Sequence, residues 1–488
     1  MSDLLAFDSI FTEIVLVISS LLLILFGVIF DKFVKDSKVP SIIAILVLAA
    51  CVYIVFTNCQ DQPLTTFNNL FLTNNYIAFA KVVIMLSAII SILFSMGYSS
   101  INKIYLKFEF PSLILFSVLG MLVMISANDF MSLYLGLELQ ALCLYTLTCF
   151  NRSDIKSSES ALKYFILGGI ASAVILYGIS FIYGFSGTSN FSVFEEIYGA
   201  YVGGKEVSFG VLIGSILVIA GFCFKIAVVP FHMWAPDVYQ GAPLPVSAFL
   251  STTPKAASIF VLAKLLISTF NIWADVWQQV ITVIAVLSLF MGALGALKQL
   301  DIKRLLAYSS INHIGFILIG IVARNQVGLE AVVIYTCIYI SMNIGIYACV
   351  SMMQKPDNEN FDLDIFKGLA KHNPVVALAI AILLLSLAGI PPFAGFLAKF
   401  YILNAAIKSE LYILSVLAML SAIISTFCYL KIIKMMYFDE NSAGSSDKLY
   451  TVENVIIASS AATFNLILIL FPSSLYGTVF FAVSGLFR

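Results

Sequence analysis

Long runs of apolar residues, separated by short polar segments, recur from one end of the chain to the other. A helix needs about 20 mainly apolar residues to cross a bilayer. The runs therefore predict fourteen membrane-spanning helices in a single integral-membrane domain, 1–488, with no room for a sizeable soluble domain. The expected spans are 10–30, 40–57, 76–98, 112–127, 129–150, 161–186, 208–240, 243–270, 278–297, 303–323, 327–352, 374–408, 411–437 and 453–473.

Prolines interrupt two of these runs, the seventh and the twelfth. The seventh contains Pro230 and Pro236, and the twelfth contains Pro391 and Pro392 in a run that is too long for one simple crossing. Proline removes a backbone donor and clashes with the preceding turn. Non-helical backbone at this depth is tolerated only where it is buried in protein or lines a cavity. We therefore expect two broken helices, and breaks of this kind point to a transport site.

The two broken spans occupy corresponding places along the chain. Spans four to eight, residues 112–270, form one five-helix unit, and spans nine to thirteen, residues 278–438, form a second. The broken helix is the fourth in each unit. Because each unit holds an odd number of helices, the second copy is inverted relative to the first. The expected fold class is an all-α integral membrane protein with two inverted five-helix repeats, although no strong residue-level identity links the halves.

Composition supports this class and excludes others. The chain is 61% apolar and 11% charged, with a mean hydropathy of +1.02, far from a soluble domain with about a quarter charged residues. No basic stripe suggests a nucleic-acid partner, and a net charge of −1 adds no support, so we discard that class. The first residues, MSDLLAFDS, lack a basic region and a cleavage site, so we expect the first helix to be retained.

Basic residues in the connecting loops predict the orientation of the chain, because lysine and arginine are retained on the cytoplasmic side. Seventeen lie in one set of alternating loops and only four in the opposite set, so both termini are expected on the outer, periplasmic side. The larger set is Lys32, Lys35, Lys38, Lys103, Lys107, Arg152, Lys156, Lys163, Lys298, Lys303, Arg304, Lys355, Lys367, Lys371, Lys431, Lys434 and Lys448. The smaller set is Lys205, Arg324, Lys408 and Arg488.

Cysteines and nucleotide motifs indicate no cofactor or metal in this chain. Of eight cysteines, seven lie in apolar spans, and none forms a C-x-x-C pair. Neither a disulfide framework nor an iron–sulfur cluster is therefore indicated. Glycine-rich phosphate-binding motifs are also missing. If redox chemistry or ATP drives the process, that chemistry takes place on another chain.

Four of the ionisable residues within the apolar runs are candidates for an ion pathway: Glu138, Lys225, Lys255 and Lys399. Each such group costs about 2.5–3.5 kcal/mol at the bilayer centre, so it usually faces the protein interior and marks an ion pathway. Burial disfavours the charged form of lysine, whereas a neighbouring carboxylate favours it. If Glu138 and Lys225 pair, the lysine stays protonated; if the carboxylate moves or is neutralised, Lys225 can release its proton to Lys255. We expect this chain to move protons across a membrane.

Several of the ionisable residues in the spans could have a purely structural role instead of a role in proton transfer. Lys225 could snorkel toward the interface, but the adjacent proline break favours a hydrated cavity. Lys81 and Lys264 lie nearer the outer ends of their spans, and we expect both to snorkel. Glu138 could serve only as a structural ion-pair partner.

Three further polar residues lie near the breaks or within a span. His313, in LLAYSSINHIGF, is either a hydrogen-bonded packing residue or part of a proton relay. His232 either packs at a helix end or takes up protons from the cytoplasm. Asp237 is expected to cap the segment beyond Pro236.

Four segments closely resemble the antiporter-like membrane subunits of respiratory complex I, and the resemblance covers essentially the whole chain. They are ESALKYFILGGIASA at 159–173, VVPFHMWAPDVYQGAPLPVSAFLSTTPKAA at 228–257, DIKRLLAYSSINHIGF at 301–316 and LSLAGIPPFAGFLAKF at 385–400.

The resemblance implies fourteen helices, inverted repeats and breaks in helices seven and twelve. It also implies that Glu138, Lys225, Lys255 and Lys399 occupy the positions of the family's helix-five glutamate and its lysines of helices seven, eight and twelve. A protein of this kind translocates protons beside other membrane-arm subunits in the bacterial inner membrane, within the lipid bilayer. FMN, iron–sulfur clusters and quinone are expected on those other subunits.

Two competing functions remain. One is a subunit of a multisubunit cation/proton antiporter, which resembles the same fold but exchanges sodium for protons without a redox partner. The other is a structural scaffold whose charges only hold subunits together. The DVYQGAP segment favours the redox-coupled pump over the antiporter.

Overall fold

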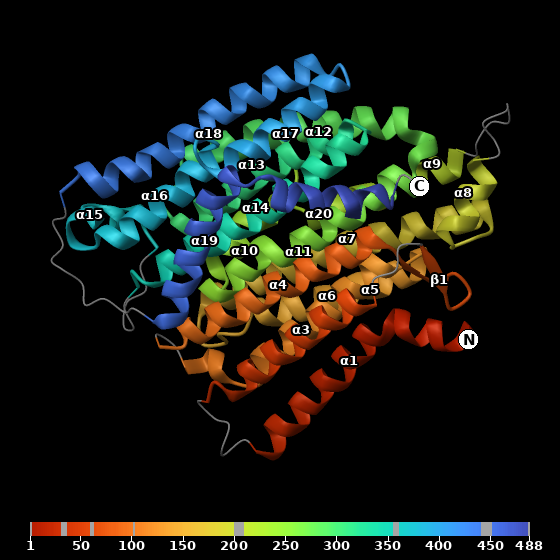
Figure 1. Cartoon of the computed structure of the whole chain (residues 1–488), viewed down its shortest axis with the longest axis horizontal. Helices are drawn as coiled ribbons and strands as arrows, with labels where there is room; N and C mark the ends of the chain where they lie inside the picture. Colours follow the sequence, from red (N-terminus) through yellow and green to blue (C-terminus); the bar gives the residue numbers. More distant parts are fainter. Residues whose placement is uncertain are drawn as a thin grey trace.

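The chain forms an almost entirely helical bundle (Figure 1) in the computed structural model, which describes residues 2–30, 37–58, 63–100, 103–199, 209–354, 361–440 and 451–486. Twelve helices in these ranges are long and apolar enough to cross a membrane. The chain is thus a multi-pass membrane protein. The residues named above that lie outside these ranges are Lys32, Lys35, Cys59, Lys205, Lys355, Lys448 and Arg488.

The elements of the N-terminal half are α1 (Ser2–Ile29), α3 (Val39–Thr57), β1 (Leu64–Thr66), β2 (Phe71–Thr73), α4 (Asn75–Tyr98), η1 (Lys103–Leu106), α5 (Glu109–Ser126), α6 (Phe130–Thr148), α7 (Ile155–Ser186), α8 (Phe191–Gly199), α9 (Phe209–Lys225), α10 (Trp234–Gly241), α11 (Leu244–Lys264) and the π turn η3 (Leu265–Thr269). Those of the C-terminal half are η4 (Asn271–Trp273), α12 (Ala274–Leu297), α13 (Ile302–Val322), α14 (Gln326–Ser351), η5 (Leu363–Phe366), α15 (Leu369–His372), α16 (Pro374–Ala388), α17 (Ala394–Lys408), α18 (Tyr412–Phe438), α19 (Val452–Leu470) and α20 (Ser473–Ser484).

Twelve of the expected spans coincide with the helices that are long enough to cross a membrane, and the chain is interrupted at both expected breaks. The expected seventh span, 208–240, contains the shorter helices α9 and α10, and the expected twelfth, 374–408, contains α16 and α17. Three features were not predicted: the antiparallel hairpin of β1 and β2, the short helix α8 and the short helix α20. Each is too short for the periodicity of a membrane span to reveal it.

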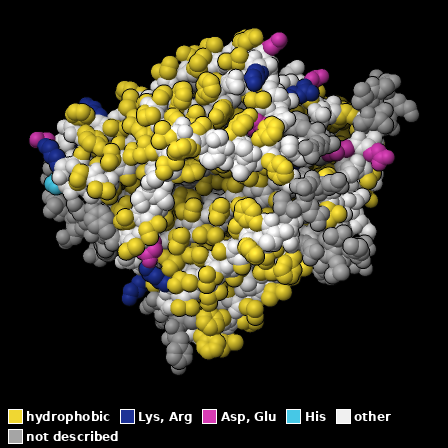
Figure 2. All heavy atoms as spheres, in the orientation of Figure 1, with side chains coloured by type: hydrophobic (Ala, Val, Ile, Leu, Met, Phe, Trp, Pro, Cys, Tyr) yellow, Lys and Arg dark blue, Asp and Glu magenta, His cyan; other side chains and the backbone are white. Residues whose placement is uncertain are grey.

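Three helices, α11, α13 and α14, occupy the centre of the bundle. Within their most apolar segments, 94%, 94% and 89% of the residues are buried, against 33% to 39% for α1, α3, α18 and α19. The face seen in Figure 2 is correspondingly apolar, with few charged side chains. An apolar exterior suits lipid tails, so the polar chemistry of the molecule is concentrated around the central helices.

Both chain ends lie on the side of the bundle that carries the hairpin. Ser9 Oγ on α1 is 2.9 Å from Thr66 Oγ1 on β1. At the other end of the chain, Gly485 packs against Asn75, where α4 begins directly after β2. Figure 1 shows both termini toward the hairpin end of the molecule. We refer to this end as the terminus face.

Helices α5 and α6 approach so closely that their backbones touch. A Cβ added at Gly136 of α6 would lie 2.7 Å from both the carbonyl oxygen of Gly120 and the amide nitrogen of Met124 on α5. Real Cβ atoms do not occupy such positions, so glycine is required for this crossing. The contact also fixes the height of Glu138, which lies two residues further along α6.

We predict that Gly136→Ala destabilises the protein, because an added methyl group must push α5 and α6 apart. Overpacking of this kind costs about 1–3 kcal/mol. The matched control is Gly169→Ala on α7, where an added Cβ meets nothing within 4 Å. Thermal unfolding of the complex purified in mild detergent should show a lower transition temperature for Gly136→Ala alone. Equal transition temperatures for the two variants would contradict the close contact.

Candidate functional site

The first broken helix ends at a lysine. Lys225 is the last residue of α9 and is half-buried. Its ammonium donates a hydrogen bond of 3.3 Å to Ser172 Oγ on α7. The C-terminus of a helix carries partial negative charge, which favours a cation there. The break therefore places Lys225 at the negative end of its own helix, with its ammonium held by a hydroxyl of α7.

Neighbouring elements supply the polar partners that the broken backbone needs. The amide of Val229 donates to Ser288 Oγ on α12 at 3.0 Å. The indole nitrogen of Trp234 donates to the carbonyl of Phe224 at 3.1 Å. Unpaired backbone groups cost several kcal/mol each in a membrane, so these two contacts make the interruption tolerable.

Glu138, on α6, lies near Lys225 but does not contact it. The glutamate is close enough to act electrostatically on Lys225. Lys225 nevertheless donates to Ser172, and Glu138 takes part in no ion pair within 4.0 Å in the described part of the chain. One carboxylate oxygen, Oε1, is buried with no hydrogen-bond partner among the described residues. The two groups are therefore coupled through space and are not joined by a direct salt bridge.

Lys255 lies within α11, directly after a proline. Because Pro254 has no N–H, the carbonyl of Leu250, four residues earlier, loses its helical partner. Tyr239 of α10 donates its hydroxyl to that carbonyl at 3.1 Å, and its ring centre lies 5.1 Å from Lys255 Nζ. Lys255 is 1% exposed and donates to Ser310 Oγ at 2.6 Å. The proline thus brings α10 against the same point of α11 that carries the lysine.

At the second break, the lysine lies on the helix that follows the break and not on the one before it. Helix α16 ends at Ala388, and Lys399 on α17 reaches back to the carbonyls of Leu387 and Ala388 at 3.1 and 2.8 Å. Between them, Gly389 has a φ of +79°, and a Cβ there would lie 2.7 Å from Lys399 Cδ. Only glycine fits this position comfortably. The Lys399 ammonium therefore caps the C-terminal end of α16, although it belongs to α17.

Both ring nitrogens of His313, on α13, have hydroxyl partners. Nδ1 is 2.8 Å from Tyr335 OH on α14, and Nε2 is 3.3 Å from Tyr429 OH on α18. Tyr429 OH is also 2.6 Å from Ser309 Oγ. A neutral imidazole offers one donor and one acceptor, and a hydroxyl can complement either. His313 is therefore hydrogen-bonded on both sides in the buried interior, where it is 1% exposed.

Helix α13 links the two central lysines. Its Ser310 accepts the hydrogen bond from Lys255, and one turn later His313 lies close enough to Lys399 to interact electrostatically. A further turn along, the ring centre of Phe316 lies 5.1 Å from Lys399 Nζ. The structure thus brings Lys255, His313 and Lys399 together around one helix.

Two more lysine side chains, those of Lys264 and Lys303, donate hydrogen bonds to carbonyls at the C-terminal ends of other helices, which the sequence did not predict. Lys264 is 4% exposed and donates to the carbonyls of Ile125 and Ala127 at the end of α5, at 3.2 and 2.7 Å. The prediction that it snorkels is wrong, because the side chain is buried and these two carbonyls accept its hydrogen bonds. Lys303, counted above as a loop residue, is also 4% exposed and donates to the carbonyl of Ala242 at the end of α10, at 2.9 Å.

The prediction that Lys81 snorkels is also wrong. Lys81 is 3% exposed and forms an ion pair of 2.6 Å with Glu13 of α1. Sequence reasoning missed Glu13, although a carboxylate within the first apolar run was an available signal.

Two residues of the first break have different surroundings. His232 is buried, and its Nδ1 has no hydrogen-bond partner among the described residues. Asp237 is not the cap of α10; it lies in the first turn and accepts hydrogen bonds from Arg304 at 2.6 Å and Lys163 at 3.3 Å. The capping prediction is wrong because the carboxylate faces a guanidinium at the start of α13, which is far away in sequence.

The hydroxyl groups of the site were not predicted either. Ser310, Tyr335 and Tyr429 come from three different helices, α13, α14 and α18. The only local signal was the pair of serines in YSSINH, just before His313. Within the described ranges, seven cysteines are free and no group of three or more His, Cys, Asp or Glu side chains could hold a metal ion.

The two broken helices and the lysines buried beside them define an antiporter-like membrane subunit. A family model described as "NADH:quinone oxidoreductase/Mrp antiporter, TM" matches residues 127–425, and the chain belongs to this family. The resemblance inferred from the four sequence segments is thereby confirmed.

Comparison with individual proteins shows which type of subunit within the family this chain resembles. NADH-quinone oxidoreductase subunit N of Paramagnetospirillum magneticum (strain ATCC 700264 / AMB-1) is 42% identical, with 92% of this chain and 91% of that protein covered. A chain of respiratory complex I from Thermus thermophilus with bound Aureothin is 26% identical, with a TM-score of 0.79 over 96% of this chain and 98% of that chain. A chain of the Mrp complex from Dietzia sp. DQ12-45-1b has a TM-score of 0.82 over 98% of each chain, but at 19% identity it shares the fold alone. Within its family, this chain is of the subunit N type.

We predict that Asp237→Asn weakens the attachment of α10 to α13. Burial raises the pKa of the Asp237 carboxyl, but the hydrogen bonds from Arg304 and Lys163 outweigh it and hold that pKa below its ordinary value. The carboxyl is about one-third exposed, so we expect a loss of less than about 1 kcal/mol. A depressed pKa contributes stability that is complete above the unfolded value of about 3.9 and is lost as pH falls through the folded value.

The check is the thermal stability of the purified complex as a function of pH. The difference between wild type and Asp237→Asn should be constant from neutral pH down to about 4 and should shrink below it. A difference that grows on acidification would contradict the ion pair.

Proposed function

We propose that this chain is a proton-translocating subunit in the membrane arm of a bacterial NADH:quinone oxidoreductase, and that protons pass through it along Glu138, Lys225, Lys255, His313 and Lys399. Electron transfer through FMN and iron–sulfur clusters to quinone then takes place on neighbouring subunits. One observation carries the proposal: the three lysines lie inside a membrane protein, and among the described residues their ammonium groups donate hydrogen bonds only to hydroxyl and carbonyl oxygens.

Neutral acceptors make each lysine able to release its proton. If a lysine that is paired with a carboxylate loses its proton, it leaves an unpaired buried negative charge, which is costly. Lys255 donates only to Ser310 among the described residues, so after deprotonation its neutral amine can accept a hydrogen bond from the same hydroxyl. These lysines are therefore suited to exchange protons, in contrast to Lys81.

In this mechanism, the charge of Glu138 controls whether Lys225 keeps its proton. A carboxylate near a lysine favours the protonated form of that lysine. When a movement in a neighbouring subunit neutralises or displaces the carboxylate, Lys225 loses its N–H proton and the amine of Lys255 takes it up. The proton number balances: one ammonium becomes an amine, and one amine becomes an ammonium.

Hydroxyl groups continue the path from Lys255 toward Lys399. Ser310 receives the Lys255 hydrogen bond, and the adjacent Ser309 contacts Tyr429, which contacts His313. Hydroxyls donate and accept, and histidine changes its protonation near neutral pH. A charge on Lys399 repels a proton on His313, so the two groups respond to one another.

The proposed arrangement has fourteen crossings, with α5 to α11 and α12 to α18 as inverted repeats. In its support, α5 packs along α6 as α12 packs along α13, and α7 packs along α9 as α14 packs along α16 and α17. An even number of crossings agrees with termini on one side. Positive charge in the opposite loops orients the terminus face toward the periplasm.

A subunit of a multisubunit cation/proton antiporter is the second candidate. The Dietzia Mrp chain has the same fold, but it is less similar in sequence than the subunit N relatives. The DVYQGAP segment also favours the redox-coupled pump over the antiporter.

We predict that Lys255→Met and Lys399→Met leave the complex assembled but abolish its proton translocation. Methionine has a similar length and no titratable group, and a positioned proton-transfer group contributes about 10²–10⁴-fold to rate. Proton uptake by inverted membrane vesicles, normalised to the amount of assembled complex, should fall by about tenfold or more. Quinone reduction should slow with it if the two processes are tightly coupled.

The control is Lys371→Met, because that side chain is 66% exposed at the end of α15. It should leave both rates unchanged. Normal translocation by Lys225→Met, Lys255→Met and Lys399→Met complexes would overturn the proposed path, and a loss of assembly without a change in rate per complex would favour the scaffold.

We further predict that the chain purifies from native membranes together with redox subunits that retain quinone reduction. Mild detergent extraction, affinity capture and identification of the copurified subunits provide the measurement. An intact assembly that lacks redox subunits and exchanges sodium for protons in vesicles would instead establish the antiporter.

A further inference from the structure

Two of the segments that stand out in the sequence, WAPDVYQGAP and DIKRLLAYSS, meet where α10 ends and α13 begins. The amide nitrogen of Gln240 on α10 donates to Asp301 Oδ2 at 3.2 Å. The amide oxygen of Gln240 accepts from Arg304 at 3.0 Å. A glutamine amide offers both donors and an acceptor, so Gln240 complements a carboxylate and a guanidinium at the same time. We refer to Gln240, Asp301 and Arg304 as the Gln240 cluster.

Asp301 holds Gln240 firmly because it also caps α13. Its Oδ1 accepts a hydrogen bond from the backbone amide of Arg304 at 3.1 Å, as an N-cap residue does. Its other carboxylate oxygen, Oδ2, accepts from the Gln240 amide. The position of Gln240 is therefore fixed relative to the first turn of α13.

The residue that precedes Gln240 contacts the central lysine. Successive residues of a helix point about 100° apart, so Gln240 faces α13 while Tyr239 faces α11. The carbonyl of Tyr239 accepts from Ser247 Oγ at 2.8 Å, and its hydroxyl donates to the carbonyl of Leu250. The ring centre of Tyr239 lies 5.1 Å from Lys255 Nζ. Helix α10 therefore supplies one partner of the Lys255 ammonium.

Helix α13 supplies the other partner. Lys255 donates to Ser310 Oγ at 2.6 Å. Because α13 is continuous from Ile302 to Val322, Ser310 keeps a fixed place relative to the first turn of the helix. The Gln240 cluster thus joins the two helices that contact the Lys255 ammonium. It sets the position of the ring from α10 relative to the hydroxyl from α13.

Attachment of α10 to α13 does not depend on Gln240. Asp237 accepts from Arg304 at 2.6 Å, and Lys303 donates to the carbonyl of Ala242 at 2.9 Å. These two contacts lie on either side of Gln240 along the chain. They keep α10 against α13 when Gln240 is changed, so the specific contribution of Gln240 is the register between the two helices.

We propose that Gln240 is a positioning residue for proton transfer at Lys255. By fixing the register of α10 on α13, it places the Tyr239 ring and the Ser310 hydroxyl around the ammonium. The inference rests on the proposed function, because it assigns a supporting residue to one lysine of the proposed path. An amide does not titrate, so Gln240 acts through its neighbours and carries no proton itself. A misplacement of about 1 Å can cost about 100-fold in rate, even when the change lies away from the chemistry.

The test uses Gln240→Glu in the whole complex in native membranes. Glutamate keeps the length of the side chain and an acceptor for Arg304, but it places a second carboxylate against Asp301. Like charges repel, so the register of α10 on α13 should change while the remaining contacts keep the complex assembled. Proton translocation per assembled complex should fall about tenfold or more.

A double variant, Gln240→Glu with Asp301→Asn, should restore the function. The amide and the carboxylate exchange places, so a donor again faces an acceptor and the total charge equals that of the wild type. Asparagine is also a good N-cap residue, so the start of α13 is preserved. Most of the lost translocation should return in the double variant.

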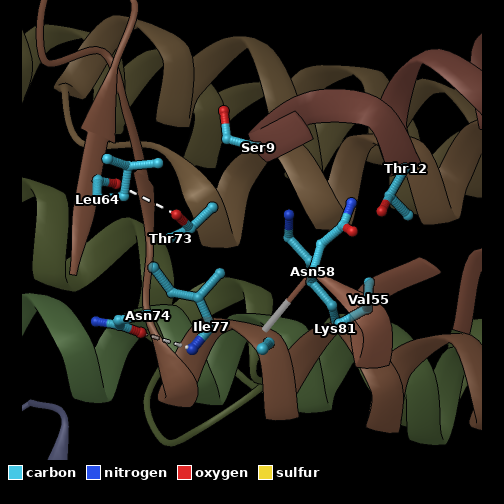
Figure 3. A pocket seen from close by; sticks show the side chains of 10 residues that line it. Ser9, Thr12, Val55, Asn58, Leu64, Thr73, Asn74, Ile77 and Lys81 are labelled. Atoms are coloured by element: carbon cyan, nitrogen blue, oxygen red, sulfur yellow. Dashed lines mark hydrogen bonds between the residues drawn. The ribbon is translucent and has the colours of Figure 1, made fainter. Parts of the chain in front are cut away.

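Two controls separate positioning from stability. Gln278→Glu matches the chemistry, because Gln278 on α12 also accepts from an arginine, Arg324, at 3.3 Å. Arg324 also donates to Asp275 at 2.9 Å, and it lies just after the opposite end of α13. Asn74→Ala removes the cap of α4, since Asn74 Oδ1 accepts from the amide of Ile77 at 2.8 Å, as Figure 3 shows. Both controls should leave translocation per assembled complex unchanged.

Gln240→Met is measured beside Gln240→Glu, because it removes both hydrogen bonds without adding a charge. It should also assemble and be slowed. Full translocation per complex in Gln240→Glu, or a double variant as slow as the single one, would overturn the inference. Failure of both Gln240→Glu and Gln240→Met to assemble would overturn it too, because attachment would then depend on Gln240.

Lys255→Met in the same membranes separates this inference from the proposed function. If Lys255→Met stops translocation and Gln240→Glu does not, only the positioning role fails. If Lys255→Met complexes translocate protons normally, the proposed function fails, and the positioning role fails with it.

Discussion

The structure depends on hydrogen bonds between lysine ammonium groups and the carbonyl oxygens at the C-terminal ends of helices. Inside a membrane, a lysine ammonium needs oxygen acceptors, and a carboxylate is the obvious one. This protein more often uses the last carbonyl groups of a helix, which carry partial negative charge and remain unsatisfied by the helix itself. Lys399, Lys264 and Lys303 are held in this way, and Lys225 is itself the last residue of a helix. The charge is stabilised, yet no buried anion is left when a proton departs.

This use of helix ends explains why two helices must break inside the bundle. An unbroken span has its free carbonyls only at the membrane surface, so it offers nothing to a lysine at mid-depth. The proline segments create new helix ends there, and side chains of other helices, such as Ser288 and Trp234, satisfy the remaining backbone groups. The proline inside α11 achieves the same effect on a smaller scale, since it frees a single carbonyl for Tyr239.

What the sequence predicted and what it missed follow from the range of each signal. Lysine within an apolar run is conspicuous, and paired prolines interrupt a helix wherever they occur, so the breaks and Lys225, Lys255 and Lys399 were recognisable. Partners from other helices were not. Asp237 looked like a local cap because Arg304 is invisible to a local pattern, and Lys81 and Lys264 looked like snorkelling residues because Glu13 and the end of α5 lie elsewhere in the chain. The hydroxyls around His313 were missed for the same reason.

The two breaks differ in whether the lysine lies on the helix before the break or on the helix after it. Lys225 is the last residue of α9 and donates to Ser172 on α7, whereas Lys399 belongs to α17 and donates to carbonyls at the end of α16. Sliding α10 away from α9 would leave Lys225 in its setting. Sliding α17 away from α16 would pull Lys399 off both of its acceptors at once. The same sliding movement, applied to both halves, would therefore separate a lysine from its hydrogen-bond acceptors in the C-terminal half only.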